Sequence, residues 1–269
     1  MKHKQLAKED YRKICTLLAI DPKTDENTTN FLNKQLAKKS TKRTLGKLKK
    51  IIEGKSVFVY GAGPTLIEGI IDSKSIIRKY KERIVIIAVD GATKALLEED
   101  ISIDIIISDL DGGFEALLRS YENNQSVLVI HGHGDNKEKL ISFIPKLGRT
   151  NIIGTTQTKE TKFVKNLGGF TDGDRAVFLA ANLSAKNVFL FAFDFGAIVG
   201  KYSKSDEFSE DFPASKRKLI KLDIAKKLLA KVPFEFPKTS FYNCTVKGEE
   251  IQNIPKISFK DLNELFIES

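Results

Sequence analysis

The sequence has few of the features that mark secreted, membrane-spanning or zinc-binding proteins. Its 269 residues include two cysteines, Cys15 and Cys244, which are too few and too far apart for a disulfide framework or a zinc-ligand pattern. No apolar run approaches the roughly 18 residues that span a bilayer, and the charged start of the chain holds no apolar signal core. These absences predict a cytoplasmic protein without a membrane segment.

Aromatic side chains are also sparse where the basic residues are densest. The net charge is +9, and lysines concentrate near 34–50 and 216–231, in stretches of helical periodicity. A surface that binds single-stranded nucleic acid interleaves basic groups with aromatic rings for base stacking, and these stretches lack that arrangement. We therefore interpret the lysines as solvated helix faces and expect no nucleic acid as a partner.

Short β-branched apolar runs, separated by stretches of helix length, dominate the middle of the chain. Their hydrophobicity is continuous rather than alternating, which is typical of parallel strands buried on both faces. The alternation of strand and helix predicts an α/β fold with a doubly wound, mostly parallel sheet. The runs lie at 57–60, 84–89, 103–107, 127–130, 151–153 and 188–193.

The same pattern divides the chain into three regions. Residues 1–52 predict a small helical N-terminal region, with a turn at Asp21-Pro22 and a helix cap at Thr28 or Thr29. Residues 53–200 predict the α/β core, and residues 201–269 a C-terminal region packed on it. Within this last region we expect a loop or lid, a helix and one or two closing strands, at 201–211, 214–231, 240–245 and 257–259.

Ligands of an open α/β sheet bind beyond the carboxyl ends of its strands, so the residues after each run are the candidates for a site. The first run leads into a glycine turn, whose backbone N–H groups are suited to phosphate at the start of a helix. A tight turn with a purely structural role is an equal alternative, because the dinucleotide fingerprint has Leu66 at its third glycine position. The candidates here are Gly61, Gly63, Pro64 and Thr65.

Carboxylates follow the next three runs. Asp90 and Gly91 come after the second run, Asp109 and Asp111 after the third, and Asp135 after the fourth. Helix capping explains Asp90 as well as ligand binding does. Two carboxylates one residue apart repel each other unless a cation or donors lie between them. Because Mg²⁺ prefers such oxygen ligands together with substrate phosphates, we predict a magnesium site at Asp109, Asp111 and Asp135.

Two histidines, His131 and His133, lie in the same loop as Asp135. A shared zinc ion would need a further soft ligand, and the remaining histidine, His3, lies at the terminus. We therefore favour hydrogen bonds from these histidines to phosphate or substrate, with a local turn as the alternative. The neighbouring fifth run ends in hydroxyl and amide groups suited to a neutral heterocycle or a phosphate, namely Thr155, Thr156 and Gln157.

A glycine-rich segment near 168–173 leads into another apolar helix. Arg175 stands beside Asp172 and Asp174, which predicts a phosphate contact held in place by the two acids. A helix cap formed by Thr171 or Asp172 is the alternative. The sixth run then ends at Asp194 and Phe195, where an aromatic ring is suited to cover a flat ligand.

The order and spacing of these pieces together resemble the archaeal 6-hydroxymethyl-7,8-dihydropterin pyrophosphokinases, which are similar to the catalytic domain of thiamin pyrophosphokinases. The resemblance spans about residues 56–195. The pieces that carry it are Gly61-Ala62-Gly63-Pro64, Asp90-Gly91-Ala92, Ser108-Asp109-Leu110-Asp111-Gly112, His131-Gly132-His133-Gly134-Asp135-Asn136, Gly154-Thr155-Thr156-Gln157 and Gly169-Phe170-Thr171-Asp172-Gly173-Asp174-Arg175.

Comparison with the thiamin enzymes leaves two other activities open. The turn at 108–112 is similar to their Gly-Asp-x-Asp-Ser metal turn, but Arg175 follows its acids where their Gly-Gly-Arg-x-Asp-His segment has the arginine first. The histidines also lie in the fourth-strand loop, so thiamin is a poor prediction for the substrate. Glycosyltransferases that modify flagella share this domain, which makes nucleotide-sugar chemistry the rival.

The resemblance implies a Mg²⁺-dependent enzyme of pterin cofactor biosynthesis that transfers pyrophosphate from ATP to 6-hydroxymethyl-7,8-dihydropterin and releases AMP. Residues 53–200 would form its nucleotide-binding catalytic core, with catalytic roles for Asp109, Asp111 and Arg175, and a homodimer is left open. Nucleotide contacts are expected from Gly61, Gly63, Pro64, Thr65, Asp90, Gly91, His133, Asp172 and Asp174. Pterin contacts are expected from Thr155, Thr156, Gln157, Thr171, Asp194 and Phe195.

The assignment of the lysines to solvated surface predicts weak binding to nucleic acid. A random DNA duplex should bind with a Kd of roughly 10⁻⁴ M or weaker at physiological salt, the level of non-specific phosphate contact. Fluorescence anisotropy with a labelled duplex measures this affinity. Submicromolar, sequence-dependent binding would contradict the assignment.

Overall fold

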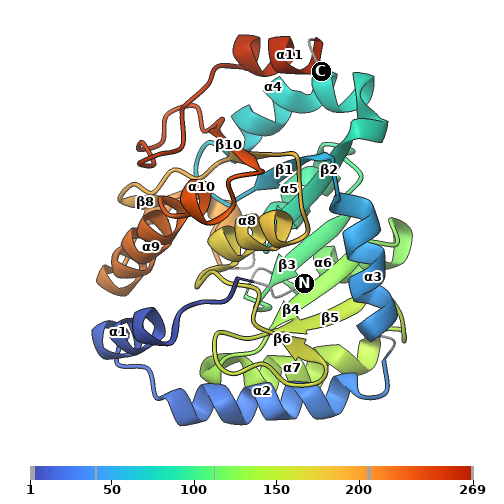
Figure 1. Ribbon diagram of the computed structural model, residues 1–269, viewed down its shortest axis with the longest axis vertical. Helices are drawn as coiled ribbons and strands as arrows, with labels where there is room; N and C mark the ends of the chain where they lie inside the picture. Colours follow the sequence, from blue (N-terminus) through green and yellow to red (C-terminus); the bar gives the residue numbers. More distant parts are fainter. Residues whose placement is uncertain (1–3, 40, 112, 205–206, 268–269) are drawn as a thin grey trace.

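The computed structural model is built on one eight-stranded sheet with helices on both faces (Figure 1). The strand order is β10-β7-β1-β2-β3-β4-β5-β6, and every neighbouring pair is parallel. The predicted parallel α/β fold is therefore confirmed. The structure describes residues 4–39, 41–111, 113–204 and 207–267. Outside these ranges lie His3, Gly112 of the acidic turn, and Ser205 and Asp206 of the expected loop.

Helices and strands alternate through most of the chain. The helices are α1 Lys8–Leu18, α2 Pro22–Leu36, α3 Thr41–Ile52, α4 Leu66–Lys79, α5 Ala92–Glu98, α6 Phe114–Asn123, α7 Lys137–Phe143, α8 Asp172–Asn182, α9 Lys216–Leu229, α10 Val232–Glu235 and α11 Phe259–Ile267. The 3-10 turns are η1 Lys81–Arg83, η2 Gly134–Asn136, η3 Ile144–Lys146 and η4 Lys201–Lys204. The strands are β1 Ser56–Tyr60, β2 Ile84–Val89, β3 Ile105–Ser108, β4 Val127–His131, β5 Ile152–Thr155, β6 Val164–Lys165, β7 Asn187–Phe191, β8 Ile198–Val199, β9 Phe212–Pro213 and β10 Ser240–Asn243.

Two hydrophobic cores form because successive side chains of each buried strand point to opposite faces of the sheet. Val57 and Val59 of β1 belong to the core on one face, which also includes residues of α1, α3, α8 and α9. Phe58 and Tyr60 belong to the core on the other face, which also includes residues of α2, α4, α5, α6, α7 and α11. Every residue of β1 and β2 is buried, which accounts for their continuous hydrophobicity.

The N-terminal helices are part of these cores. Asp21 caps α2 by accepting a hydrogen bond from the Lys23 N–H at 3.0 Å, and proline stands in the first turn. The cap predicted at Thr28 or Thr29 is therefore wrong, since both residues lie buried inside α2. These polar residues interrupt the apolar periodicity of the helix. Thr29 is nevertheless accommodated in the interior, because its Oγ1 hydrogen-bonds with Thr156 Oγ1 at 2.7 Å.

The C-terminal region follows the prediction in part. α9 lies within the expected helix, and β10 extends the sheet beside β7 as expected. The second closing strand is not formed, and α11 begins at Phe259 instead. The cause is local: Ser258 accepts from the Asp261 N–H at 3.2 Å while the Asp261 carboxylate accepts from Ser258, which fixes a helix start.

The chain connectivity locates the crevice where a ligand of this fold binds. β2 to β6 follow β1 on one side of it, whereas β7 pairs with β1 on the other side. In open parallel sheets such a switch point leaves a crevice at the carboxyl ends of the strands. Among the described residues we find no helix with the length and apolar character needed to cross a bilayer.

Substitution of Gly154 in β5 tests how closely α2 packs on the sheet. A Cβ atom there would lie 2.7 Å from Leu36 Cδ1 and 3.0 Å from Val164 Cγ2. We expect Gly154→Ala to lower the free energy of unfolding by about 1–3 kcal/mol through overpacking. Denaturant titrations of Gly154→Ala in wild-type and Leu36→Ala backgrounds measure the coupling. The cost should fall when Leu36 is shortened, and an equal cost in both backgrounds would contradict this packing.

Candidate functional site

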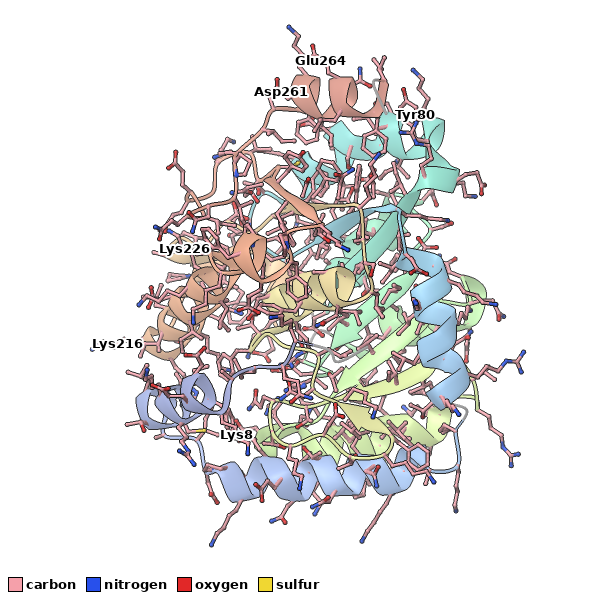
Figure 2. The ribbon with its side chains drawn as sticks, viewed as in Figure 1. Lys8, Tyr80, Lys216, Lys226, Asp261 and Glu264 are labelled. Atoms are coloured by element: carbon pink, nitrogen blue, oxygen red, sulfur yellow. The ribbon has the colours of Figure 1, made fainter. Side chains whose placement is uncertain are left out.

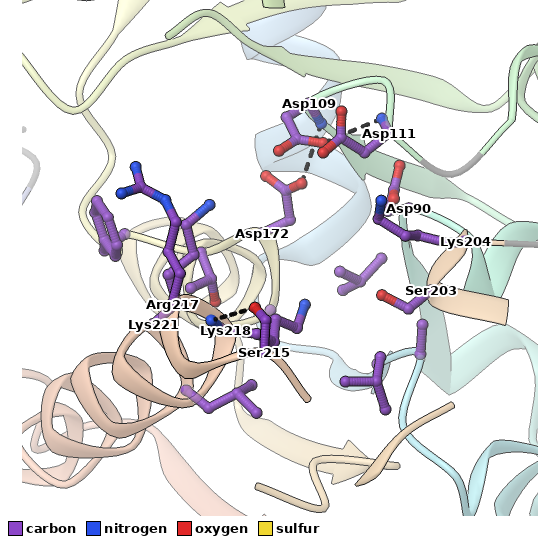
Figure 3. A pocket seen from close by; sticks show the side chains of 18 of the residues that line it. Asp90, Asp109, Asp111, Asp172, Ser203, Lys204, Ser215, Arg217, Lys218 and Lys221 are labelled. Atoms are coloured by element: carbon purple, nitrogen blue, oxygen red, sulfur yellow. Dashed lines mark hydrogen bonds between the residues drawn. The ribbon is translucent and has the colours of Figure 1, made fainter. Parts of the chain in front are cut away.

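A pocket of about 790 Å³ opens at the carboxyl ends of β1, β2, β3, β4 and β7. Its volume is in the range of small-molecule and cofactor sites. The floor is formed by strand ends, and the walls come from the α1–α2 turn, the start of α8, the segment that contains η4, and α9. Figure 3 shows carboxylates gathered on one side of this pocket and basic side chains of α9 across from them.

The acidic side of the pocket is organised by the turn after β3. The Ser108 hydroxyl donates to Asp90 Oδ1 at 2.5 Å and accepts from the Leu110 N–H at 2.8 Å. Leu110 has a positive φ of 71° and buries its side chain in the core. Asp109 and Asp111 therefore stand on either side of a residue that has left-handed backbone geometry and a side chain held in the core.

Asp109 and Asp172 meet at the centre of the acidic side. The Asp109 N–H donates to Asp172 Oδ2 at 3.0 Å, and Asp109 Oδ2 lies 3.4 Å from His133 Nε2. Burial acts to raise the pKa of Asp109, but the hydrogen bond and charge of His133 bring that pKa below its usual range. Burial, followed by the nearby Asp109, raises the pKa of Asp172 to about 7. Burial and the same two carboxylates raise the pKa of Asp90 well above its usual range.

Arg175 supports this side from behind the pocket wall. Its Nη2 donates to Phe170 O at 2.8 Å and contacts His131 Nε2 at 3.1 Å, and its Nε lies 3.6 Å from Asp172 Oδ1. Since guanidinium only donates, His131 Nε2 accepts, and the imidazole is the neutral Nδ1–H tautomer. Burial and the charge of Arg175 lower the pKa of His131 well below its usual range, in agreement with that state.

The remaining two metal candidates lie farther out. The Asp111 carboxylate is paired with Lys139, and Asp135 is exposed at the pocket rim. Across the ranges that the structure describes, no three His, Cys, Asp or Glu side chains converge closely enough to hold a metal ion. Asp109, Asp111 and Asp135 therefore do not form a complete ligand cluster on their own.

Two glycines bring the first loop close to β7. A Cβ on Gly61 would lie 2.8 Å from Ala192 O, and one on Gly63 would lie 2.0 Å from Asp194 Oδ2. Asp194 accepts a hydrogen bond from Thr65 Oγ1 at 3.1 Å, which fixes the loop. The N–H groups of Ala62 and Gly63 have no hydrogen-bond partner within the described part of the chain. The glycines thus serve a tight turn and also leave two donors free for a ligand.

Most of the candidate site residues line this pocket. Those that do are Gly61, Gly63, Pro64, Asp90, Asp109, Asp111, His131, His133, Asp135, Gln157, Thr171, Asp172, Asp174, Asp194 and Phe195. The pocket lining does not include Thr65, Gly91, Thr155, Thr156 and Arg175. Gly91 instead packs against the backbone of Tyr202, where any Cβ would clash with the carbonyl oxygen.

The start of α8 contains a helix cap and also an acid that faces the pocket. Thr171 and Asp174 form a capping box, in which the Asp174 carboxylate accepts from the Phe170 and Thr171 N–H groups at 2.7 Å each. These two N–H groups are therefore occupied and cannot also bind phosphate. Asp172 at the first helical position remains directed at Asp109 and the pocket.

Two contributions to the site come from residues that the sequence pattern did not predict. Lys218 and Lys221 of α9 line the pocket, so their interpretation as solvated surface is wrong; helical periodicity alone could not show which face of α9 meets the core. Asp25 of α2 is buried and accepts from Tyr11 OH, Gln157 Nε2 and the Gly134 N–H at 2.7, 2.5 and 2.6 Å. This acid ties the N-terminal helices to two pocket loops, and its polar helical neighbours gave no signal of that role.

The raised pKa of Asp172 predicts how stability depends on pH when a chelator is present. The unfolded carboxyl titrates near its ordinary pKa of about 3.9, whereas the folded one titrates near 7. The folded state therefore holds this proton more tightly and loses stability as pH rises between those values. Asn does not titrate, so the Asp172→Asn variant should not show this loss. The unfolding free energy of the variant minus that of the wild type should therefore rise by about 2 kcal/mol from about pH 5.5 to about pH 8.5. Urea titrations at both pH values measure this, and an unchanged difference would refute it.

The comparisons with known proteins agree with the geometry. The family model described as 6-hydroxymethylpterin diphosphokinase MptE-like matches residues 29–200. A 6-hydroxymethyl-7,8-dihydropterin pyrophosphokinase of Methanocaldococcus jannaschii is 40% identical over 237 residues, covering 85% of this chain and 96% of that protein. One of Methanothermobacter thermautotrophicus is 39% identical over 223 residues, covering 81% and 90%.

A further relative and a solved structure complete the comparison. The Pyrococcus furiosus protein of the same name is 43% identical over 173 residues, covering 64% of this chain and 70% of its own. The solved MAf glycosyltransferase of Magnetospirillum magneticum AMB-1 has a TM-score of 0.53 at 16% identity, with 85% of this chain matching 40% of that one, so the likeness shows the fold alone. The resemblance seen in the sequence is confirmed, and this chain belongs to the 6-hydroxymethylpterin diphosphokinase MptE-like family.

Proposed function

We propose that this protein transfers the pyrophosphoryl group of ATP to 6-hydroxymethyl-7,8-dihydropterin and releases AMP. The names of its relatives support this reaction. The observation in the structure that carries the proposal is the contact of Asp109 with Asp172, beside Asp90, in a pocket of about 790 Å³. Buried like charges of this kind are costly and are typical of sites that bind cations and phosphates.

The donor set of this pocket fits magnesium that is shared with a nucleotide. Mg²⁺ is commonly held by one or two carboxylates, with water and phosphate oxygens completing its shell. Asp109 and Asp111 would hold the ion, and phosphate oxygens of the nucleotide would complete its shell. When bound, the ion supplies positive charge to the transferring phosphoryl oxygens.

The backbone and side chains of the pocket would position the reacting groups. The free N–H groups of Ala62 and Gly63 would bind phosphate oxygens at the end of β1. The pterin hydroxymethyl oxygen would then bond to the β-phosphorus as the bridge to the α-phosphate breaks, with its proton passing to solvent. Such transfer needs positioning and charge stabilisation and no covalent nucleophile.

Arg175 has a different role from the one expected in the sequence analysis. Its side chain is 1% exposed and lies outside the pocket lining, so it does not reach a phosphate from this position. Its Nε faces Asp172 at 3.6 Å, and its Nη2 holds His131. We assign it to fixing the Asp172 carboxylate and the α8 entrance.

The expected pterin contacts lie at two ends of the pocket, because Gln157 follows β5 whereas Asp194 and Phe195 follow β7, with β1 to β4 between them. The pterin would occupy the β7 end, beside Asp194 and Phe195. A pterin is flat and carries amide-like donors and acceptors, which suit an aromatic ring and polar side chains. Thr155 and Thr156 are fully buried, and their hydroxyls bond within the protein to His131 and Thr29. They support the β5 end of the pocket and would not touch the pterin.

The reaction itself is tested by incubating the protein with Mg²⁺, ATP and 6-hydroxymethyl-7,8-dihydropterin and following products by phosphorus NMR. The expected products are AMP and a pterin diphosphate. ADP with a pterin monophosphate would indicate an ordinary kinase and contradict the proposal. Failure with the pterin, combined with cleavage of a nucleotide sugar, would favour the glycosyltransferase alternative.

Substitution of Asp109 separates a ligand role from a structural one. Asp109→Asn keeps the side-chain size and should change the free energy of unfolding by no more than about 1 kcal/mol. Turnover should nevertheless fall about a hundredfold or more, because charge that stabilises the transition state is lost. Steady-state kinetics over a range of Mg²⁺ concentrations measure both turnover and metal demand. Asp223→Asn on the exposed side of α9 is the matched control, and wild-type turnover in Asp109→Asn at limiting Mg²⁺ would refute the assignment.

A further inference from the structure

Two lysines of α9 face the acidic side of the pocket. Lys218 and Lys221 both line the pocket, and Figure 3 shows them across from Asp90, Asp109 and Asp172. The charge of Lys221 lowers the pKa of Asp109, and the charges of Asp109, Asp90 and Asp172 act to raise the pKa of Lys218. The lysines and the acids therefore interact electrostatically across a space that a ligand can enter.

Lys218 and Lys221 differ from their neighbours on α9 in the ion pairs that the described residues form. Lys226 pairs with Glu249 at 2.6 Å and Lys227 pairs with Asp223 at 2.7 Å. For Lys218 and Lys221, no hydrogen bond or ion pair of the ammonium group occurs within the described ranges. Burial, and then the charge of Lys221, lowers the pKa of Lys218, and an anion bound between the two lysines would oppose both effects.

The helix that carries the two lysines, α9, is held to the rest of the protein at both ends. Ser215 caps α9 by accepting from the Lys218 N–H at 3.1 Å, and Arg217 donates to the Leu18 carbonyl oxygen at the end of α1. Leu228 and Leu229 anchor the other end of α9 in the core. These contacts fix the backbone from which the two lysines extend toward the pocket.

We propose that Lys218 and Lys221 form the wall of the pocket that binds the polyphosphate chain of the nucleotide. This inference rests on the proposed function and assigns the nucleotide phosphates to the space between α9 and the acidic side. The phosphate chain would pair with the lysines on one side, and with the free N–H groups of the loop after β1 at the pocket floor. α9 lies beyond the matched residues 29–200, so the C-terminal region would supply binding residues from outside the matched segment.

Calorimetric titration with α,β-methylene-ATP tests this wall without turnover, because that analogue cannot be cleaved between its α- and β-phosphates. The double variant Lys218→Gln/Lys221→Gln should bind the analogue about a hundredfold or more weakly than wild type, as expected when partly buried charge pairs are lost. Adenosine, which carries no phosphate, should bind both proteins equally. Lys216→Gln is the matched control, since Lys216 lies on α9 at the periphery of the molecule and outside the pocket lining (Figure 2).

Further arms of the experiment separate the two proposals. Lys218→Arg/Lys221→Arg keeps both charges and should bind the analogue within about tenfold of wild type, which excludes a folding defect as the cause. Wild-type affinity in the Gln double variant, in a protein that forms pterin diphosphate, would overturn the lysine assignment alone. Lysine-dependent binding of the analogue by a wild type that turns over no pterin would support the lysine assignment and overturn the proposed function.

Discussion

Repulsion among carboxylates at one edge of the sheet is the constraint around which this site is built. Asp90 follows β2, Asp109 follows β3, and Asp172 begins α8, and parallel strands bring all three to the same edge. The fold offsets part of their repulsion with neutral donors and buried cations. The Ser108 hydroxyl bonds to Asp90, and His133 and Arg175 lie beside Asp109 and Asp172. The uncompensated remainder favours the binding of positive charge in the pocket.

The support for this edge comes from parts of the chain that lie far apart in sequence. A buried carboxylate from α2, Asp25, holds Gln157 and the loop that carries His133. α9 closes the opposite wall and is tied to α1 through Arg217. The site therefore depends on the N-terminal helices and the C-terminal helix as well as on the α/β core. The N-terminal helices and α9 are rich in charged residues, and both contribute side chains to the pocket or to its support.

The parallel sheet and the acidic edge were predictable from the sequence, because both depend on local pattern. Continuous apolar runs identified β1, β2 and β7, and the carboxyl-end rule placed Asp90 and Asp109 together. β6 has two residues and gives too short a run to recognise. The orientation of Lys218 and the burial of Arg175 depend on which face of a helix packs inward, and only tertiary structure decides that.

Interdependent binding of metal and nucleotide is the property that follows most directly from the proposed sharing of Mg²⁺ between the acidic edge and the nucleotide phosphates. Thermal unfolding of the wild-type protein with Mg²⁺ alone, with α,β-methylene-ATP alone and with both measures it, since a ligand raises Tm according to its affinity for the folded state. Both ligands together should raise Tm by more than the sum of their separate shifts. A Tm shift with Mg²⁺ alone equal to that with both ligands would contradict a metal site completed by the nucleotide phosphates.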